Sequence, residues 1–568
     1  MSLQSGEKND LRETVKKIAA QNALRHGGRA DPSSVMGKLL ALKPELRGQI
    51  KDLMPLVREI CDEISSIPQE RLSEIYGEKE EIKKKVEQDL PELPGAIPGK
   101  VVTRFAPNPN SALHLGSSRA AVLSHDYARK YEGKFIVRFE DTDPRLKRSD
   151  MKFYDMIKED LKWLGCEWDE IYVQSERMEL YYKWAEEAIK RGLAFVTECD
   201  SERFRSLILK SMPCPDRELP PDEQLKRWNK MLNGDYREGQ AVVRIKTDLE
   251  HPNPAVRDWP ALRIIDPEKH SHPIVGKKYR VWPLYNWASA VDDHIMNITH
   301  IIRGQEHFVN MIRQGYVYEA LGWSYPQAVH YGKLMIEGGS LSKSEIEKGM
   351  KEGKFTGYDD PRLATLVALR RRGIEPESIR KMIHEMGINP NTATVSLDMI
   401  YALNRKIIDP LSNRYFGVFG KLHSLKLEGI PAQIKVTLPR HPSNPERSKR
   451  IITLNGRTVL VEDQDYLSNL EKEFRLIGLG NFKLVNDRAQ FLNNDLNYAR
   501  ALSHIHWVPE GENINVTVLM EDATELNGKC EQNITSELPG SHVQFERKFF
   551  AKLERIEPDR VYAIYTSR

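Results

Sequence analysis

The sequence of 568 residues predicts a multidomain α/β protein built around a doubly wound parallel sheet. Its length suits three to four domains at about 150 residues each. Strand-like and helix-like segments alternate between residues 101 and 192, as expected when helices connect the strands of a parallel sheet. After residue 409, short alternating runs separated by turns replace the helices, which favours one or two antiparallel β-barrels.

Composition restricts the class of protein. Apolar residues are 40% and charged residues 29%, and 85 Lys and Arg against 82 Asp and Glu leave a net charge of +3. These values are typical of a folded, soluble chain, so any nucleic-acid site must be a local basic surface. Neither a membrane span nor the apolar core of a secretion signal is predicted. Five scattered cysteines disfavour a disulfide framework and fit a cytoplasmic location.

Residues 1–98 are predicted to form a helical domain. Apolar residues recur at spacings of three and four in residues 11–28 and 51–67. The charged run 78–90 alternates acids and bases, so a solvated helix face is favoured over an arm that binds nucleic acid. The proline- and glycine-rich segment LPELPGAIPGK then forms a linker and the first domain boundary.

Residues 99–196 are predicted to form the first half of the parallel sheet. Strand segments VVTRF, KFIVRFE and EIYVQ are each followed by a helical pattern, and Gly133, Gly165 and Gly192 end these helices. In such sheets ligands bind at the carboxyl ends of the strands.

The remaining divisions follow from changes in pattern. Residues 197–278, which carry many prolines, are interpreted as an α/β insertion between the two halves of the sheet. The second half is predicted over 279–335, a loop and helical connector over 336–408, and β-barrels over 409–568.

Two loops carry candidate phosphate-binding groups. After the first strand, Ala-Pro-Asn-Pro leads to His114, Gly116 and Ser117 at the start of a helix, whose N-terminus presents free N–H groups to phosphate. After the strand AVHYGKL, the loop IEGGSLSKSE places Lys343 between serines. The dinucleotide fingerprint G-x-G-x-x-G is absent from the first crossover. Taken alone, each loop is more simply a helix cap or a solvated polar loop.

Together the two loops resemble the paired signatures of class I aminoacyl-tRNA synthetases, HIGH after the first strand and KMSKS after the last. Four blocks in order resemble the glutamyl/glutaminyl subclass, namely Thr103 to Pro109, Arg138 to Pro144, Tyr285 to His294 and Ile298 to His307. The resemblance covers residues 100–568, and the β-rich end with HPSNPERSKR is similar to the archaeal/eukaryotic branch. It implies a Rossmann-type catalytic domain followed by an anticodon-binding region.

The signatures depart from the family pattern. HIGH reads His-Leu-Gly-Ser and lacks its second histidine, and KMSKS reads Ser-Leu-Ser-Lys-Ser and lacks its first lysine. The retained His114 and Lys343 would then carry more of the phosphate contacts. Some relatives hold zinc near the insertion, but Cys199 and Cys214 are too few for a closed site, so no structural zinc and no protein-held metal is expected.

The resemblance implies that ATP activates L-glutamate and that tRNA(Glu) accepts it, with Mg²⁺ bridging the phosphates and His114 and Lys343 as the catalytic residues. The implied ATP-binding residues are Pro107, His114, Gly116, Ser117, Leu341, Ser342 and Lys343. The implied glutamate-binding residues are Arg104, Ala106, Asn108, Glu140, Tyr285 and Arg303. Glu140, or its neighbour Asp141, is expected at the α-ammonium group. The two arginines are expected at the side-chain carboxylate, which a guanidinium binds through paired hydrogen bonds.

Two other functions stay open. A glutaminyl-tRNA synthetase is disfavoured because, by resemblance, those enzymes lack an arginine at position 303. A non-catalytic tRNA-binding or scaffold protein would account for the weakened signatures. In any of these, the insertion should open the acceptor end, Arg370 to Arg372 should follow the RNA backbone, and the barrels should hold anticodon bases. Charging of tRNA(Gln), the role of residues 1–98 and the oligomeric state are left open.

Overall fold

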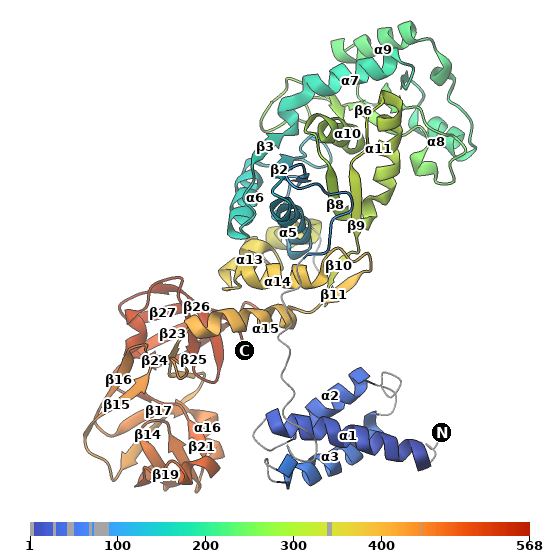
Figure 1. Cartoon of the computed structure of the whole chain (residues 1–568). Coiled ribbons are helices and arrows are strands. Elements are labelled where there is room, and N and C mark those ends of the chain that lie inside the picture. The colour runs from blue at the N-terminus through green and yellow to red at the C-terminus, as the bar shows by residue number, and fades with distance from the viewer. Residues whose placement is uncertain are drawn as a thin grey trace. The chain divides into compact units, whose positions relative to one another are not determined.

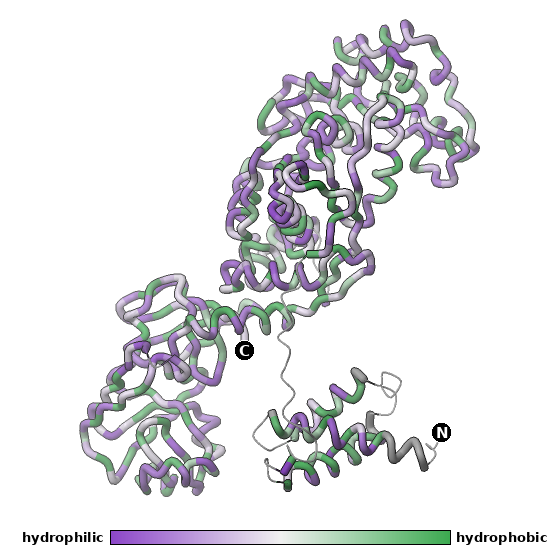
Figure 2. The backbone as a smooth tube through the Cα atoms, in the orientation of Figure 1, coloured by the Kyte–Doolittle hydropathy of each residue, from purple (hydrophilic) through white to green (hydrophobic). Residues whose placement is uncertain are grey.

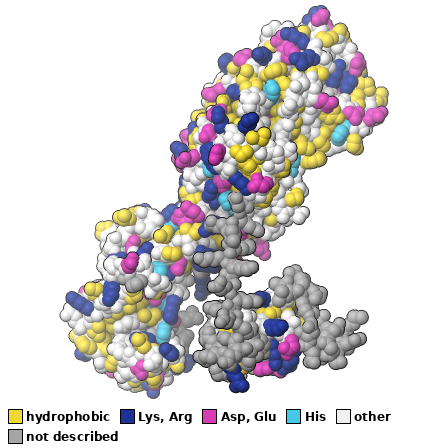
Figure 3. Space-filling view, in the orientation of Figure 1, with side chains coloured by type: hydrophobic (Ala, Val, Ile, Leu, Met, Phe, Trp, Pro, Cys, Tyr) yellow, Lys and Arg dark blue, Asp and Glu magenta, His cyan; other side chains and the backbone are white. Residues whose placement is uncertain are grey.

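The computed structural model describes residues 5–25, 30–42, 50–67, 71–72, 90–337, 343–444 and 446–568. The chain divides into two compact units, Met1–Gln88 and Asp89–Arg568 (Figure 1). Among the described residues, no helix combines the length and the apolarity needed to cross a membrane. Hydrophobic and hydrophilic residues are interleaved along the coloured trace in Figure 2. On the face shown in Figure 3, acidic and basic side chains are likewise interspersed.

The described residues of the first unit are mainly helical, as the sequence predicted, and three of its helices have described bounds. These are α1 (Ser5–Arg25), α2 (Pro32–Leu42) and α3 (Ile50–Ser65). Their apolar faces bury Val15, Leu39 and Val57 in a common core. Lys16 and Glu63 form an ion pair of 2.7 Å between α1 and α3. The predicted charged helix at 78–89 lies outside the described residues.

The second unit begins with the predicted alternation of strands and helices. Parallel strands β1 (Val102–Phe105), β2 (Lys134–Phe139) and β3 (Glu170–Val173) lie in that order, and α5 (Leu115–Lys130), α6 (Met151–Trp163) and α7 (Met178–Lys190) follow them. A second parallel pair consists of β8 (His300–Gly304) and β9 (Gln327–Tyr331).

The two strand groups meet between β1 and β8. The backbone N–H of Val102 donates to Thr299 Oγ1 at 2.8 Å, and its carbonyl accepts from the N–H of Thr299 at 3.0 Å. Helix α5 packs against β1, β2 and β8 (Figure 1). The predicted doubly wound architecture is therefore confirmed, and its switch point lies between β1 and β8, where such sheets bind ligands.

The segment between the two halves forms a four-stranded antiparallel sheet in chain order. Its elements are β4 (Ala194–Thr197), α8 (Ser201–Leu209), α9 (Pro221–Asn233), β5 (Val242–Ile245), β6 (Pro260–Ile264) and β7 (Val281–Pro283). It shares a core, which includes Trp228, Trp259 and Trp282, with α10 (Tyr285–Ile295) and α11 (Phe308–Leu321). Helix α10 is therefore held between the insertion and the parallel sheet.

A helical connector follows the second half of the sheet. It contains β10 (Leu334–Ile336), α12 (Lys343–Lys351), α13 (Leu366–Arg371), α14 (Pro376–Met386), β11 (Ala393–Val395) and α15 (Leu397–Ile408). Arg119 of α5 donates to the carbonyls of Gly332 and Gly387 at 2.8 Å each. Asp126 of α5 accepts from Arg380 of α14 at 2.6 Å. These buried contacts fasten the connector to the helix that follows β1.

The C-terminal region contains two seven-stranded sheets and a hairpin. The first sheet has β12 (Asn413–Tyr415), β13 (Gly417–Phe419), β23 (Asn513–Leu519), β24 (Glu525–Glu531), β25 (His542–Phe545), β26 (Phe549–Ile556) and β27 (Arg560–Ser567). The second has β14 (Leu422–Glu428), β17 (Thr458–Glu462), β18 (Glu473–Leu476), β19 (Gly480–Val485), β20 (Arg488–Asn493), β21 (Ser503–Ile505) and β22 (Val508–Pro509). The hairpin is β15 (Gln433–Pro439) with β16 (Lys449–Asn455), and α16 (Asp463–Ser468) follows β17.

The sequence predicted antiparallel sheets, but these sheets also contain parallel strand pairs. The pairs β12–β25, β14–β20, β18–β21 and β23–β27 are parallel. All strands of the second sheet lie between β13 and β23 in the sequence. The first sheet therefore combines strands that are far apart in the sequence. The six-part division of the chain made from the sequence stays a prediction.

Candidate active site

A buried network of arginines and carboxylates lies where β1 and β2 end. Arg104 of β1 donates from Nε and Nη2 to the two carboxylate oxygens of Asp293, at 3.2 Å each. Arg138 of β2 donates to the same carboxylate at 2.7 Å and to Glu140 Oε1 at 3.1 Å. Because Asp293 belongs to α10, these charge-assisted bonds fix both strand ends against that helix.

The carboxylates of this network differ in their freedom to bind a ligand. Burial alone would raise the pKa of Asp293, but Arg104 and Arg138 outweigh it and lower that pKa to about 2. Burial raises the pKa of Glu140, whose side chain is 12% exposed. Within the described part of the chain, Arg138 is the one hydrogen-bond donor to the Glu140 carboxylate. Glu140 therefore keeps an oxygen for a further cation.

Asp141, the alternative to Glu140, is fully engaged within the protein. Its Oδ1 accepts from the N–H of Ser175 at 2.8 Å, and its Oδ2 accepts from the Tyr154 hydroxyl at 2.6 Å and from Ser175 Oγ at 2.7 Å. Asp141 is 1% exposed. The geometry thus favours Glu140 over Asp141 as the group that faces a ligand.

The loop after β1 is fastened to the end of β2. The N–H of Glu140 donates to the Pro107 carbonyl at 2.9 Å, and Asn108 Nδ2 donates to the Glu140 carbonyl at 2.7 Å. Asn108 Oδ1 is buried and has no hydrogen-bond partner. A buried acceptor without a donor is costly, so this oxygen is suited to accept from a bound ammonium or amide group.

Arg303 of β8 presents a buried guanidinium, 5% exposed, to the same edge of the sheet. In the described residues it donates only to neutral acceptors, at 3.1 to 3.4 Å, which are Tyr285, Gln314, Tyr325 and His330. No described carboxylate forms an ion pair with it, whereas Arg104 has Asp293. Buried charges are normally paired, so this cation is available to an anionic ligand.

His307, His330 and Tyr285, which lie beside Arg303, are neutral at physiological pH. Burial and the nearby guanidinium lower the pKa of both His307 and His330 to about 4. Burial raises the pKa of Tyr285, which keeps its hydroxyl protonated. The side chains that accept hydrogen bonds from Arg303 therefore leave its charge uncompensated.

The start of α5 is shaped by His114. Its backbone N–H donates to Ser117 Oγ at 2.9 Å, and its Nδ1 accepts from the N–H of Gly116 at 3.0 Å, which caps the helix. A Cβ on Gly116 would lie 2.9 Å from the histidine ring, so glycine allows the ring to fold over the first turn. The N–H of Leu115 donates to the Ala364 carbonyl at 3.1 Å, which joins this turn to the connector.

Lys343, the other predicted catalytic residue, is the first residue of α12. Its Nζ lies 3.5 Å from Glu347 Oε1, and the side chain is 34% exposed. No contact between described residues links Lys343 to His114. The predicted ATP-binding residues Leu341 and Ser342 lie outside the described residues.

The structure thus brings Arg104, Asn108, Glu140, Tyr285 and Arg303 to one edge of the parallel sheet. Ala106 and Pro107 lie in the loop that joins them to the start of α5. The sequence did not single out four residues of this site, namely Arg138, Asp293, Gln314 and Tyr325. The first two lie in blocks that matched the family pattern, which was the available signal for them.

The basic stretch Arg370 to Arg372 was expected to follow RNA, but its side chains are engaged within the protein. Arg371 pairs with Glu554 at 2.7 Å. Arg372 is 2% exposed and donates to the Tyr401 hydroxyl at 2.7 Å. Arg371 therefore fastens the connector to the first C-terminal sheet, through Glu554 of β26. The prediction that this stretch follows RNA is wrong for Arg372.

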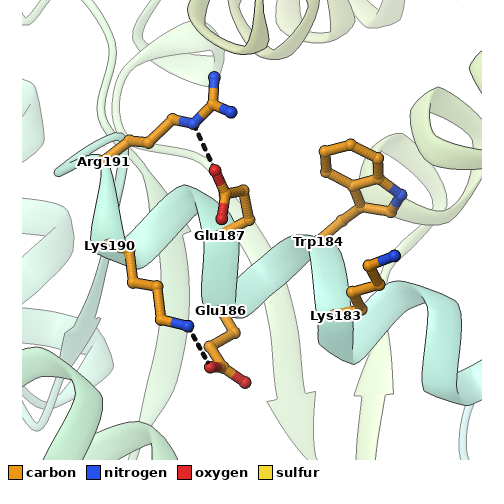
Figure 4. Close-up of a pocket in the computed structure, with 6 residues that line it drawn as sticks. All are labelled: Lys183, Trp184, Glu186, Glu187, Lys190 and Arg191. Atoms are coloured by element: carbon orange, nitrogen blue, oxygen red, sulfur yellow. Dashed lines mark hydrogen bonds and ion pairs between the residues drawn. The ribbon is translucent and has the colours of Figure 1, made fainter.

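A surface pocket of about 290 Å³ lies on α7 (Figure 4). Its lining residues are Lys183, Trp184, Glu186, Glu187, Lys190 and Arg191. Glu186 pairs with Lys190 and Glu187 with Arg191, each at 2.6 Å one helical turn apart. Five of these residues lie on α7 and Arg191 is its C-cap, and none belongs to the predicted site.

A basic pocket of about 340 Å³ lies between the first C-terminal sheet and the β15–β16 hairpin. Its lining residues are Arg414, Leu438, Pro439, Pro442, Arg450, Ile477, Gln544, Glu546 and Arg547. Arg450 is held by Glu531 at 3.0 Å and by Glu546 at 3.2 Å. Gln544 of β25 is partly buried and Arg547 is exposed.

Comparisons with known proteins cover nearly the whole chain. Residues 100–410 match the catalytic domain of "tRNA synthetases class I (E and Q)", and residues 412–499 match the anticodon-binding domain of the same family. The glutamate–tRNA ligases of Pyrococcus furiosus and Thermococcus kodakarensis are each 49% identical, over 98% of this chain and 100% of theirs. That of Methanopyrus kandleri is 44% identical, over 98% of this chain and 99% of its own. Since both the sheet that carries the site and the barrels match, the chain belongs to the glutamyl/glutaminyl family of class I aminoacyl-tRNA synthetases.

Proposed function

We propose that this chain is a glutamate–tRNA ligase, which activates L-glutamate with ATP and transfers it to the 3′ end of tRNA(Glu). The observation that carries the proposal is Arg303, a buried guanidinium whose described partners are all neutral. A side-chain carboxylate would complete its hydrogen bonds and its charge. The neutral amide of glutamine would leave the buried cation uncompensated. The glutamate–tRNA ligases that match along the chain support the same choice.

The other residues of the site supply the remaining contacts to glutamate. Glu140 binds the α-ammonium through its free oxygen, and Asn108 Oδ1 accepts a further hydrogen bond. Arg104 donates from Nε and Nη2 to Asp293, and its Nη1 makes no hydrogen bond to a described residue. We assign this Nη1 to the substrate carboxylate. Ala106 and Tyr285 form the wall between these polar groups.

Activation joins two anions, so it needs donors where charge develops. A glutamate carboxylate oxygen forms a bond to the α-phosphorus of ATP, and the bond from that phosphorus to the bridging oxygen breaks, so pyrophosphate leaves with the electron pair. His114, Gly116 and Ser117 present the start of α5 to the phosphates, beside Pro107. Lys343, with Leu341 and Ser342, contacts the leaving phosphates from the other loop.

Mg²⁺ is proposed only as a partner of the ATP phosphates, whose charge it would neutralise. No group of three or more His, Cys, Asp or Glu side chains in the described ranges could hold a metal ion.

Glutamate-dependent ATP–pyrophosphate exchange, run with and without tRNA, tests the proposal. Exchange with glutamate and not with glutamine is the expected result. Exchange with glutamine alone would identify a glutaminyl-tRNA synthetase, and no exchange with either would favour a non-catalytic tRNA-binding protein. Charging of purified tRNA(Glu) and tRNA(Gln) side by side then shows whether one or both are substrates.

Replacing Lys343 by alanine is expected to slow adenylate formation by about 100-fold, because one cationic donor to the phosphates is lost. The affinity for tRNA should change by less than about two-fold. Exchange at saturating tRNA and filter binding measure the two effects. Lys348→Ala is the matched control, because Lys348 lies on the same helix and makes the same type of pair with Glu352, at 3.8 Å. Equal losses in both measurements would instead place the loop in RNA docking.

Replacing Gln544 by alanine is expected to weaken tRNA binding by about 10-fold, because the basic pocket would lose a hydrogen-bonding group for a splayed base. The KM for glutamate at saturating tRNA should stay within about two-fold. Filter binding of tRNA(Glu) gives the dissociation constant. Arg555→Ala is the control, since Arg555 lies on neighbouring β26 but pairs with Glu557 at 2.8 Å. An unchanged dissociation constant would remove this pocket from the tRNA interface.

A further inference from the structure

Gln314 contacts the guanidinium of Arg303 from the far side of the site. It lies on α11 and is 1% exposed. Its Oε1 accepts from Nη1 and Nη2 of Arg303 at 3.4 Å each and from the Tyr325 hydroxyl at 2.8 Å. The Tyr325 oxygen in turn accepts from Nη2 of Arg303 at 3.1 Å. One amide oxygen thus lies across the outer end of the guanidinium fork, and a tyrosine holds it there.

The arrangement leaves a buried donor without a partner. Gln314 Nε2 makes no hydrogen bond, although it is buried. An unmade bond of this kind destabilises the fold. A glutamate at this position has the same shape, would keep the two bonds from the guanidinium to Oε1 with a charge added, and would leave no donor unpaired. For stability alone, a carboxylate would be the better choice next to an unpaired arginine.

A carboxylate at position 314 would, however, neutralise Arg303. A guanidinium that is already paired offers little to a second carboxylate, because the substrate would compete with a permanently tethered anion. The amide gives the fork the same hydrogen-bonding direction with no net charge. The site therefore fixes the geometry of Arg303 and leaves its charge uncompensated.

We infer that Gln314 is a positioning residue that sets the preference for an anionic amino acid. Together with Tyr325 it orients Arg303, and its neutrality reserves the charge of Arg303 for the side-chain carboxylate of glutamate. The inference rests on the proposed function and adds to it a specificity-determining residue that does not touch the substrate.

Gln314→Glu in the full-length chain is the decisive variant. The KM for glutamate in ATP–pyrophosphate exchange should rise by about 30-fold, since a competing buried anion is introduced. The ratio of kcat/KM for glutamate over glutamine should fall by about 10-fold. The KM for ATP and the tRNA dissociation constant should stay within about two-fold. The Tm should not fall, because the new carboxylate pairs with Arg303 and no donor stays unpaired.

A merely structural role for Gln314 predicts the reverse pattern. In that case Gln314→Glu would lower the Tm and weaken the binding of all substrates together. Tyr325→Phe is the second variant, which removes the hydroxyl that links Arg303 to Gln314 and should raise the KM for glutamate by about five-fold. Tyr318→Phe is its control, because the Tyr318 ring packs 4.9 Å from that of Tyr325 while its hydroxyl donates to the Ala290 carbonyl.

The outcomes separate this inference from the proposed function. If the unmodified chain shows no glutamate-dependent exchange, both are overturned. If it does, and Gln314→Glu keeps its KM for glutamate within about two-fold, only the inference is overturned. Should Gln314→Glu fail to fold, Tyr325→Phe decides, and an unchanged KM in that variant overturns the inference.

Discussion

Replacing Arg303 by alanine is expected to raise the KM for glutamate by about 100-fold in ATP–pyrophosphate exchange. Removing one partner of a buried, hydrogen-bonded charge pair costs about 2–5 kcal/mol, and about 1.4 kcal/mol corresponds to a factor of ten. The KM for ATP should change little, because the described contacts of Arg303 are all to side chains around the amino-acid pocket. Steady-state exchange with varied glutamate at saturating ATP and tRNA measures the effect.

The fold should survive this substitution. The groups that Arg303 contacts are neutral, so its removal leaves no buried charge unpaired. The Tm is therefore expected to change by less than about 3 °C. Arg313→Ala is the matched control, because Arg313 lies on α11 and donates to the backbone carbonyl of Ala255 at 2.7 Å. An Arg303→Ala protein with an unchanged KM for glutamate would place Arg303 outside the pocket.

The family resemblance in the sequence implied several site residues that lie at the ends of strands of the parallel sheet. Arg104, Glu140 and Arg303 lie in or next to β1, β2 and β8, and the alternating pattern alone brings the ends of such strands to one edge. The partner of Arg104 was not predictable in this way. Asp293 is 189 residues away along the chain and reaches Arg104 only because α10 packs against the sheet.

Gln314 illustrates a second limit of the sequence. On α11 it is one polar residue among several, and nothing in the spacing distinguishes a buried glutamine from an exposed one. Arg372 shows the same limit in reverse, because a run of three arginines suggests a surface yet this side chain is buried. Burial of a polar group depends on which elements pack around it, and that information is tertiary.

The sequence predicted that the C-terminal region consists of strands, but not which strands pair. Alternating runs identify strands, and turn residues separate them. Pairing between β12 and β25 joins residues 413–415 to residues 543–545 in parallel. The local pattern cannot show that the chain leaves the first sheet after β13 and returns to it at β23. The parallel pair of β12 with β25 joins chain from the two sides of that excursion.

Replacing Asp293 by asparagine is expected to lower stability more than any other single change in the site. This carboxylate is 2% exposed and pairs with two arginines, of which Arg138 is fully buried. Breaking a buried pair by neutralising one partner costs about 3–5 kcal/mol, because uncompensated charge is left behind. For a domain of 150–250 residues this corresponds to a fall in Tm of about 6–20 °C. The contrast with Arg303→Ala is physical, since that change removes an unpaired cation, whereas this one leaves Arg104 without its carboxylate and Arg138 with Glu140 and Asp292 alone.

The stability difference between Asp293→Asn and the unmodified chain should depend on pH. The folded pKa of Asp293, about 2, lies below the value of about 3.9 for an unfolded aspartate. Its contribution is therefore fully present above pH about 4 and is lost as the pH falls toward about 2. Urea unfolding at pH 7 and near pH 2.5, followed for the catalytic region by the fluorescence of its buried tryptophans, measures this. The gap between the two proteins should shrink by about 2 kcal/mol in acid.

Asp169→Asn is the control for this comparison. Asp169 pairs with Arg129 at 2.9 Å, but its side chain is 36% exposed, so solvent screens the pair and the expected loss is below about 1 kcal/mol. A loss of unfolding free energy in Asp293→Asn that is as small as this, or that does not decrease in acid, would mean that other groups compensate the charges of Arg104 and Arg138. In that case Asp293 would not be the group that holds Arg104 in position, and the orientation assigned to Arg104 toward the substrate would have to be abandoned with it.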